Sequence, residues 1–408
     1  MARDVEHDPL DFARSIGGKL VFTPGPTEVA EEVRQAMALP VANSDLDPEF
    51  ARLYRATCRQ LGELMHTRND VLILAGEGLL GLEAAVASLV EPGDRVLCLA
   101  NGLYGRGFAD FARDWGAEVT LFEADDREPL DAAELERFLS EREAAGSGGE
   151  TPLFRLATLV HCETPTGLLN PVDRLLPVLK RHGILTVVDS VSAIAAVPLE
   201  ADAWGADVVL GGSQKALSAP PGLAFLSVSP AAWERMRRRR HPVPGVYLNL
   251  WRWHEEWLGQ GIFPYTPSTS DIYALHEAVR RALAEPEAER FGRHERIARA
   301  VRAAIRAAGL ELYPREEASS PSVTAWLVPE VLRPREAELR ERLWRQHGVM
   351  MAGSWGPTAG LVWRAGHMGE NARPEKGERF VRALVELLRE AGWAMPGDPV
   401  AAYRAALG

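Results

Sequence analysis

Residues 185–215, LTVVDSVSAIAAVPLEADAWGADVVLGGSQK, decide the fold of this chain. Two short apolar runs within them, 185–188 and 208–210, are typical of buried strands. The first run is followed by Asp189, and the second by a glycine-rich turn that ends at Lys215. The separation of 26 positions (215 minus 189) is long enough for one crossover to the next parallel strand. A carboxylate and an amine are therefore expected at the carboxyl ends of strands, where such sheets bind ligands.

Similar apolar runs lie on both sides of this stretch and alternate with helical patterns. They bring the number of predicted strands to seven, the others being 71–75, 96–100, 118–122, 156–160 and 223–226. Continuous apolar strands separated by helices indicate an α/β fold with a mostly parallel sheet covered on both faces. Beyond about residue 275, stretches rich in Ala, Arg and Glu (271–308, 334–347 and 375–391) predict helices of a smaller α+β domain. We predict an N-terminal arm (1–20), a large domain (21–275) and a small C-terminal domain (276–408).

Composition excludes several functional classes. The chain has 408 residues and a net charge of -11, which argues against a concentrated basic face for nucleic acid. No apolar stretch reaches the roughly 20 residues that a membrane span needs. The three cysteines, Cys58, Cys98 and Cys162, fit neither a metal site nor a disulfide framework. We therefore expect no metal and no membrane or nucleic-acid partner, and we predict a cytoplasmic protein with reduced thiols.

The arrangement of Lys215, Asp189 and a glycine-rich turn suits pyridoxal 5′-phosphate (PLP). The aldehyde of PLP needs an amine, its pyridine nitrogen needs a carboxylate that keeps it protonated, and its phosphate needs backbone N–H groups at the start of a helix. Lys215 and Asp189 supply the first two groups. The turn at residues 76–84, GEGLLGLEA, lies between a predicted strand and a predicted helix and supplies the third.

The same turn also matches the G-x-G-x-x-G pattern of nicotinamide-dependent oxidoreductases. That alternative requires an acidic residue at the end of the next strand to hold the ribose. Here the strand is followed by Asn101 and Gly102, with no carboxylate. The glycine pattern alone is weak evidence, so we prefer PLP.

Motifs along nearly the whole chain resemble those of class V PLP-dependent aminotransferases, in the group of alanine–glyoxylate and serine–pyruvate aminotransferases. The matching segments follow the family's order: 23–27 (TPGPT), 76–83 (GEGLLGLE), 100–105 (ANGLYG), 161–167 (HCETPTG), 189–191 (DSV), 213–222 (SQKALSAPPG) and 364–369 (RAGHMG). The segment 213–222 is the most specific of them. The resemblance implies PLP fold-type I, a homodimer with shared active sites, and transfer of an amino group from a small amino acid to a 2-oxo acid such as glyoxylate or pyruvate.

The resemblance also implies a role for individual residues. Lys215 would bind the PLP aldehyde covalently and act as the catalytic base, and Arg364 would hold the substrate carboxylate, near Gly25. The remaining residues would contact the cofactor: Asp189 the ring nitrogen, Tyr104 and Val191 the two ring faces, Thr164 the phenolic oxygen, and Gly78, Leu79 and Gln214 the phosphate. Thr266 would reach the phosphate in the neighbouring subunit. His161 and His367 lie in matching motifs but are better interpreted as packing residues.

Some positions depart from the family pattern. Glu77 replaces a small or hydroxyl residue, and we expect its carboxylate to point away from the phosphate. Leu79 replaces residues that add a side-chain hydrogen bond, and the segment 42–49 differs from the serine- and glyoxylate-specific forms. These departures leave the amino donor open. Alternatives are a lyase or a specialised-amine transaminase on the same scaffold and, less favoured, a nicotinamide-dependent oxidoreductase or an inactive binding protein.

Overall fold

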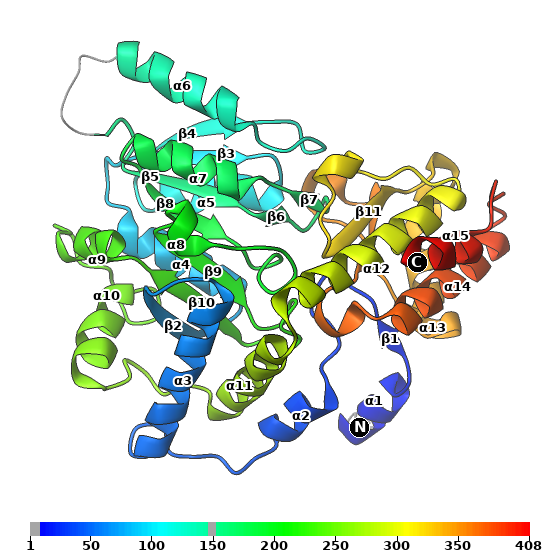
Figure 1. Cartoon of the computed structure of the whole chain (residues 1–408), viewed down its shortest axis with the longest axis horizontal. Helices are drawn as coiled ribbons and strands as arrows, with labels where there is room; N and C mark the ends of the chain where they lie inside the picture. Colours follow the sequence, from blue (N-terminus) through cyan, green and yellow to red (C-terminus); the bar gives the residue numbers. More distant parts are fainter. Residues whose placement is uncertain (1–8, 146–151) are drawn as a thin grey trace, which may run out of the picture.

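The structure is a computed structural model that describes residues 9–145 and 152–408. The first eight residues of the predicted arm lie outside the described residues. Figure 1 shows a large sheet with helices on both of its faces, and beside it a second group of helices and short strands formed by the C-terminal part of the chain. This two-layered covering of a sheet is the architecture that the alternating pattern predicts.

The large sheet has seven strands in the order β2-β10-β9-β8-β5-β3-β4. Its strands are β2 (Asp70–Ala75), β3 (Arg95–Ala100), β4 (Glu118–Glu123), β5 (Leu156–Val160), β8 (Leu185–Asp189), β9 (Val208–Gly212) and β10 (Leu223–Val228). Only β10 runs antiparallel to its neighbours, β2 and β9. Each of the seven strands contains one of the apolar runs found in the sequence, so the prediction of a mostly parallel, seven-stranded sheet is confirmed.

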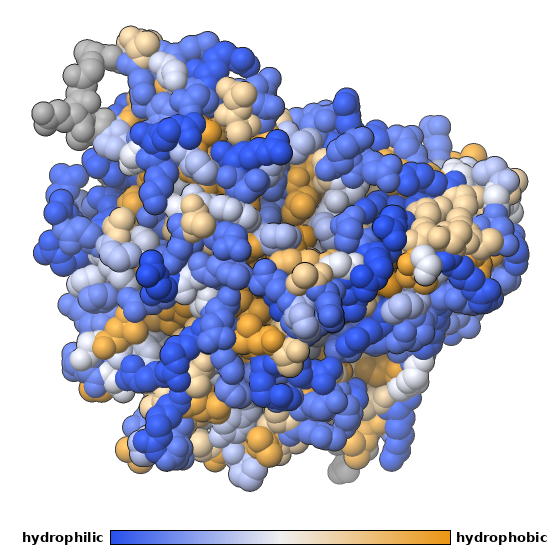
Figure 2. All heavy atoms as spheres, in the orientation of Figure 1, coloured by the Kyte–Doolittle hydropathy of each residue, from blue (hydrophilic) through white to orange (hydrophobic). Residues whose placement is uncertain are grey.

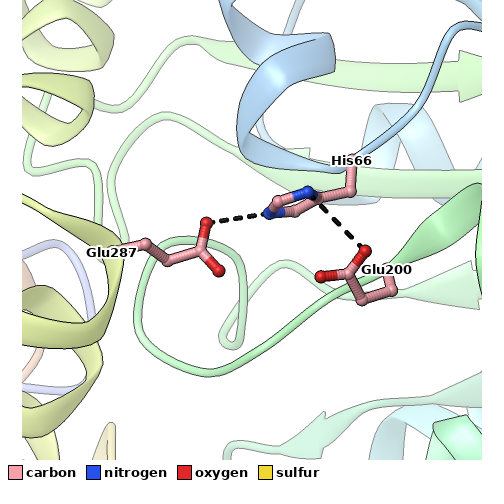
Figure 3. Close-up of side chains that lie close together, drawn as sticks. All are labelled: His66, Glu200 and Glu287. Carbon is pink, nitrogen blue, oxygen red and sulfur yellow. Dashed lines mark hydrogen bonds and ion pairs between the residues drawn. The ribbon is translucent and has the colours of Figure 1, made fainter.

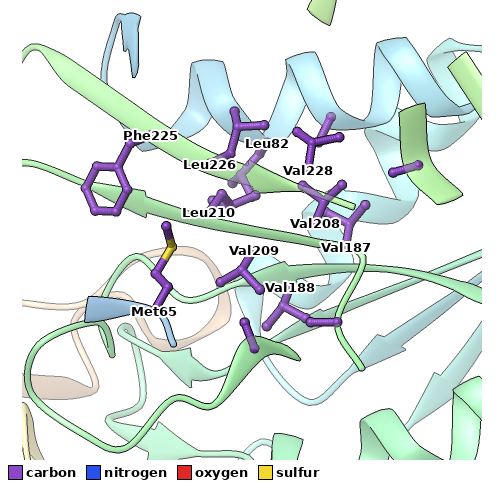
Figure 4. Close-up of a cluster of buried hydrophobic side chains, with 14 of the residues drawn as sticks. Met65, Leu82, Val187, Val188, Val208, Val209, Leu210, Phe225, Leu226 and Val228 are labelled. Atoms are coloured by element: carbon purple, nitrogen blue, oxygen red, sulfur yellow. The ribbon is translucent and has the colours of Figure 1, made fainter. Parts of the chain in front are cut away.

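Helices cover both faces of this sheet, because its strands bury side chains on both sides. The helices of this part are α3 (Pro48–Leu64), α4 (Gly78–Leu89), α5 (Leu103–Asp114), α6 (Ala132–Ala145), α7 (Val172–Arg181), α8 (Ala201–Trp204), α9 (Pro230–Arg237) and α11 (Thr269–Ala284). Figure 4 shows Leu82 of α4 beside Leu210 and Leu226 on one face, while Val209 and Met65 lie on the other. Successive strand residues point to opposite faces, which explains this division.

The C-terminal part forms a second apolar cluster around Trp326, Trp363, Phe380 and Tyr403. It contains α12 (Glu287–Ala307), α13 (Glu336–His347), α14 (Pro374–Glu390), α15 (Pro399–Leu407) and the antiparallel pair β11 (Val323–Leu327) and β13 (Val362–Gly366). The predicted helical stretch 271–308 is two helices, α11 and α12, since Pro286 stands at the N-cap of α12.

The N-terminal strand β1 (Leu20–Val21) pairs in parallel with β12 (Val349–Met350), so the start of the described chain packs on the C-terminal cluster. The predicted domain limits at residues 20 and 275 stay a prediction. The remaining elements are α1 (Pro9–Ile16), α2 (Glu31–Met37), β6 (Cys162–Glu163), β7 (Leu168–Leu169), α10 (Leu250–Arg252), a π-helix (Trp253–Leu258) and short 3₁₀ turns.

The surface is mostly hydrophilic on the face drawn in Figure 2, where apolar side chains form separate groups. Isolated apolar groups are normal on protein surfaces. Among the described residues, no helix is both long and apolar enough to cross a membrane.

Candidate active site

The carboxyl ends of β8 and β9 place Asp189 and Lys215 on one cavity of about 490 Å³. β8 and β9 are parallel neighbours in which Asp189 pairs with Leu210. The turn after β9 then carries Lys215 back over the edge of the sheet. The cavity is lined by nearly all residues that the sequence singled out: Gly25, Gly78, Leu79, Tyr104, Thr164, Asp189, Val191, Gln214, Lys215 and Arg364.

Lys215 lies against the N-terminal segment of the chain. Its Nζ donates a hydrogen bond of 2.8 Å to the carbonyl of Pro24. Gly25 has a left-handed φ of +111°, and a Cβ there would lie 2.5 Å from the Cδ of Lys215, so only glycine fits. Burial, with the nearby Arg364 cation, lowers the pKa of Lys215 to about 8. Near neutral pH a larger share of the amine is therefore neutral than in an exposed lysine, and the neutral form can act as a nucleophile and base.

Asp189 presents a buried carboxylate at the floor of the cavity. Its Oδ1 accepts a hydrogen bond of 2.9 Å from the backbone N–H of Val191, which fixes the side chain. Burial raises the pKa of Asp189 to about 6, and the Val191 N–H and the Lys215 charge act in the opposite direction. A cationic ring nitrogen placed against this carboxylate would favour its ionised form.

Tyr104 enters the cavity from the first turn of α5, which a buried glutamate caps. Glu163 accepts hydrogen bonds of 2.7 Å from the N–H of Gly105 and 3.2 Å from the N–H of Tyr104. Burial raises the pKa of Glu163 to about 7. Glu163 lies within the matching motif 161–167, but no role was predicted for it from the sequence. Its position after a strand and three residues into the matching motif was the available signal.

Arg364 lies on β13 and is held by two backbone carbonyls. Its Nε donates to Gly353 at 2.7 Å and its Nη1 to Thr164 at 3.1 Å. These bonds fix the guanidinium plane on the cavity wall, where Arg364 is only 7% exposed. Burial lowers its pKa to about 10, so the group remains a cation.

The Thr164 side chain is held on the cavity wall by Ser192, since their hydroxyl oxygens lie 2.5 Å apart. Trp355, which the sequence analysis missed, lines the same cavity and is 64% exposed. An exposed indole beside a cavity offers a flat face to a ligand. No sequence motif marks Trp355, because it follows a glycine- and serine-containing loop with no regular pattern.

Glu77 does not point away from Leu79 and Gln214, the residues predicted to contact the phosphate, although this was expected from the sequence. It is the N-cap of α4, and its Oε1 accepts the backbone N–H of Leu79 at 3.1 Å. Its Oε2 lies 3.4 Å from the Nε2 of Gln214. The physical reason is local: a free N–H at a helix start attracts the nearest carboxylate.

Thr266 is the one predicted site residue that does not line the cavity; it lies exposed on the surface. His161 and His367 also lie outside the lining. Both are buried and hydrogen-bonded, His161 to Ser190 at 3.0 Å and His367 to Thr324 at 2.8 Å. Burial lowers the pKa of each to about 3, so both rings are neutral.

The residues that line the cavity match the chemical groups of PLP unequally at its two ends. The amine, the buried carboxylate and the aromatic and aliphatic ring faces suit the aldehyde, the ring nitrogen and the flat ring. The helix start of α4 suits a phosphate only after Glu77 has left the N–H of Leu79, because a carboxylate and a phosphate cannot share one donor. The ring end of the cavity therefore fits as it stands, and the phosphate end fits after a side-chain movement.

The structure also has a second cavity and a group of three polar side chains on its rim. This second cavity, of about 940 Å³, lies along α3 and residues 66–71 and contains none of the predicted site residues. On its rim, His66 faces two carboxylates, Glu287 at 2.8 Å from Nε2 and Glu200 at 3.6 Å from Nδ1 (Figure 3). The ligand atoms of this group lie within 4.8 Å of one another. Because the two ring nitrogens face different carboxylates, we interpret this group as a polar bridge that links α12 to the chain after α3 and before α8.

The chain is similar to known proteins in both sequence and fold. The family model described as aminotransferase class-V matches residues 23–331. The pyridoxamine–pyruvate transaminase of Mesorhizobium japonicum is 32% identical over 91% of this chain and 92% of that protein. The alanine–glyoxylate aminotransferase of Oryctolagus cuniculus is 29% identical over 91% and 93%. The crystal structure of ureidoglycine–glyoxylate aminotransferase from Bacillus subtilis superposes with a TM-score of 0.89 at 29% identity, covering 95% of this chain and 97% of that one.

Proposed function

Since this chain belongs to the class V aminotransferases and is a PLP-dependent transaminase, we propose that it transfers an amino group from a small amino acid of the alanine or serine type to pyruvate or glyoxylate. The names of the relatives support these acceptors, because each contains pyruvate or glyoxylate. The observation that carries the proposal is the meeting of Lys215, Asp189 and Arg364 on one cavity.

PLP, when bound, supplies an aldehyde that takes up the amino group and a protonated ring that stabilises the carbanion formed at the substrate. Asp189 would hold the proton on the ring nitrogen, since a buried carboxylate next to a cationic nitrogen favours the charged pair. Tyr104 and Val191 would contact the two faces of the planar ring and hold its nitrogen next to Asp189. Thr164 would donate to the phenolic oxygen.

Lys215 would carry the proton during transfer. Its pKa of about 8 leaves enough neutral amine to accept the α-proton of the substrate. The same group would then return the proton to a neighbouring carbon. The carbonyl of Pro24 accepts a hydrogen bond from Lys215 and so positions the amine at the cavity.

Arg364 would bind the α-carboxylate shared by amino acids and 2-oxo acids. Its two bonds to backbone carbonyls fix the planar guanidinium, which suits a two-pronged contact with a carboxylate. Apart from Lys215, Arg364 is the one cation among the cavity residues described. This favours substrates with a single carboxylate over dicarboxylic ones.

We further propose a homodimer with shared sites in a cytoplasmic enzyme. Thr266 is exposed here, and so are apolar side chains of neighbouring segments such as Leu46, Tyr247 and Ile262. A second subunit would cover them and bring its Thr266 to this cavity. The three cysteines are free thiols, as is usual in a reducing compartment.

The test is a panel of amino acids against pyruvate and glyoxylate, followed by half-reaction spectra. We expect stoichiometric 2-oxo acid from the donor and loss of the visible absorption when the donor is added alone. A lyase on this scaffold would release products without consuming an acceptor. Turnover that needs no 2-oxo acid would therefore contradict the proposal.

A further inference from the structure

The phosphate end of the cavity already holds an anion, the carboxylate of Glu77. Its Oε1 accepts the N–H of Leu79 at 3.1 Å, and its Oε2 accepts the Nε2 amide of Gln214 at 3.4 Å. These are the same two residues that the sequence analysis assigned to the phosphate. A phosphate group and a carboxylate both only accept hydrogen bonds here, so they compete for these donors.

The charge of the cavity lining argues in the same direction. Its ionisable cations and carboxylates, among the residues described, are Lys215, Arg364, Glu77 and Asp189, which balance one another. Lys215 and Arg364 are assigned to the aldehyde and the substrate carboxylate, and no further cation is left to offset a phosphate. A dianion added beside Glu77 would be a like-charge neighbour, and their repulsion disfavours its binding although solvent reaches the exposed Glu77.

The hydrogen-bonding character of Glu77 argues in the same direction. Its carboxylate offers only acceptors, and the side chain is exposed at the cavity that it lines. A hydroxyl can donate to such an acceptor, whereas a fully ionised phosphate ester cannot. The phosphate end of the cavity therefore suits a hydroxymethyl group.

We propose that Glu77 competes with the phosphate of PLP, and that the cavity also accepts the phosphate-free ring, pyridoxamine or pyridoxal, as an exchangeable amino donor or acceptor. With this ring, Glu77 keeps its bond to Leu79 and accepts the hydroxymethyl proton. With PLP, Glu77 has to leave. The inference rests on the proposed function, because Lys215 and Asp189 serve the ring in the same way in both cases.

The reaction balances without an added oxidant. Pyridoxamine and pyruvate give pyridoxal and alanine: the CH₂–NH₂ carbon of the ring substituent becomes a carbonyl, and the carbonyl carbon of pyruvate becomes CH–NH₂. The nitrogen and three hydrogens pass to the acceptor, two of them on the amino nitrogen and one as the proton on the new CH carbon, and the carbonyl oxygen passes the other way through water. Lys215 transfers the proton between the two carbons.

The experiment measures binding of the two ring forms to the full chain freed of cofactor. Visible absorption is titrated with PLP and, separately, with pyridoxal, for the unaltered protein, for Glu77→Ser and for Glu77→Gln. We expect the ratio of the PLP Kd to the pyridoxal Kd to fall at least tenfold in Glu77→Ser, since one like charge is removed. Glu77→Gln should lower the ratio in the same direction, and it keeps the oxygen that caps α4.

Glu83→Gln, on the same helix, is the matched control and should leave the ratio unchanged. A ratio that falls less than tenfold in folded Glu77→Ser, or in Glu77→Gln where the serine variant does not fold, overturns the inference. Failure of the unaltered protein to make alanine from pyridoxamine and pyruvate also overturns it. The proposed function fails separately if no amino acid donates to a 2-oxo acid, because the binding ratio does not depend on turnover.

Discussion

The Glu163 carboxylate and the backbone N–H of Tyr104 are joined by a hydrogen bond of 3.2 Å, although the residues are 59 positions apart in sequence. The bond anchors the start of α5 to β6, and with it the Tyr104 ring that lines the cavity. Because Glu163 is buried, the charge that makes this bond strong is also costly to hold.

Glu163 should make the stability of the enzyme depend on pH. Its pKa is raised to about 7, so between its usual pKa near 4.5 and 7 the folded chain binds more protons than the unfolded chain. The contribution of this residue is therefore most favourable below that window and is lost as pH rises through it. We expect urea unfolding to show a loss on the order of 3 kcal/mol from pH 4.5 to pH 8, relative to Glu163→Gln. Parallel curves for the two proteins would contradict this expectation.

Lys215 should be the single site of covalent attachment of the ring. The chain has only four lysines, Lys19, Lys180, Lys215 and Lys376. Borohydride reduction should abolish the visible band and leave the label on the peptide that carries Lys215. Lys215→Ala should bind the ring without a stable link and lose turnover, while Lys180→Arg serves as the control. Label recovered on another lysine would refute the assignment.

Asp189→Asn should keep the fold and lose most activity. An amide cannot hold the ring nitrogen protonated, so the ring stabilises a carbanion less well, by several kcal/mol. We expect turnover to drop on the order of 10³-fold, with weaker retention of the ring because a charge-assisted hydrogen bond is lost. The neutral isostere preserves the bond to Val191 in length. Near-normal turnover would exclude the proposed role of Asp189.

Arg364→Lys should raise the KM for both amino acids and 2-oxo acids. A lysine point charge cannot reproduce the two-pronged contact, and the bonds to Gly353 and Thr164 would be lost. The loss in kcat/KM should be roughly 2–4 kcal/mol. The absorption spectrum of the bound ring serves as the control and should not change. An unaltered KM for both substrates would speak against a carboxylate contact.

Thr266 tests the shared site of the proposed homodimer. Mixing Lys215→Ala subunits with Thr266→Ala subunits gives hybrids in which one site lacks both groups and the other has both. Hybrid activity should exceed that of either parent. Lys215→Ala protein taken through the same mixing procedure alone is the control. A fully active monomer in sedimentation would rule out the arrangement.

Much of the site could be predicted because it depends on strand ends. Asp189 and Lys215 follow buried runs in the sequence, and parallel strands bring such ends to the same edge of a sheet. The direction of Glu77 was predicted wrongly, because the free N–H of Leu79 at the start of α4 was not weighed as a partner for its carboxylate.

The roles of Glu163 and Trp355 were missed for different physical reasons. A buried carboxylate that caps a distant helix leaves no periodic trace in the sequence. Trp355 lies in an irregular loop, whose path is set by packing rather than by local propensity.

The register between β8 and β9 has a consequence for how this enzyme can diversify. The ring end of the cavity is set by backbone pairing, Asp189 opposite Leu210, which tolerates little change without loss of the sheet. The phosphate end is set by one side chain, Glu77, at the exposed start of a helix. Descendants of such a gene can therefore acquire a new preference for the ring's substituent through a single codon, while the inherited chemistry at Lys215 stays intact.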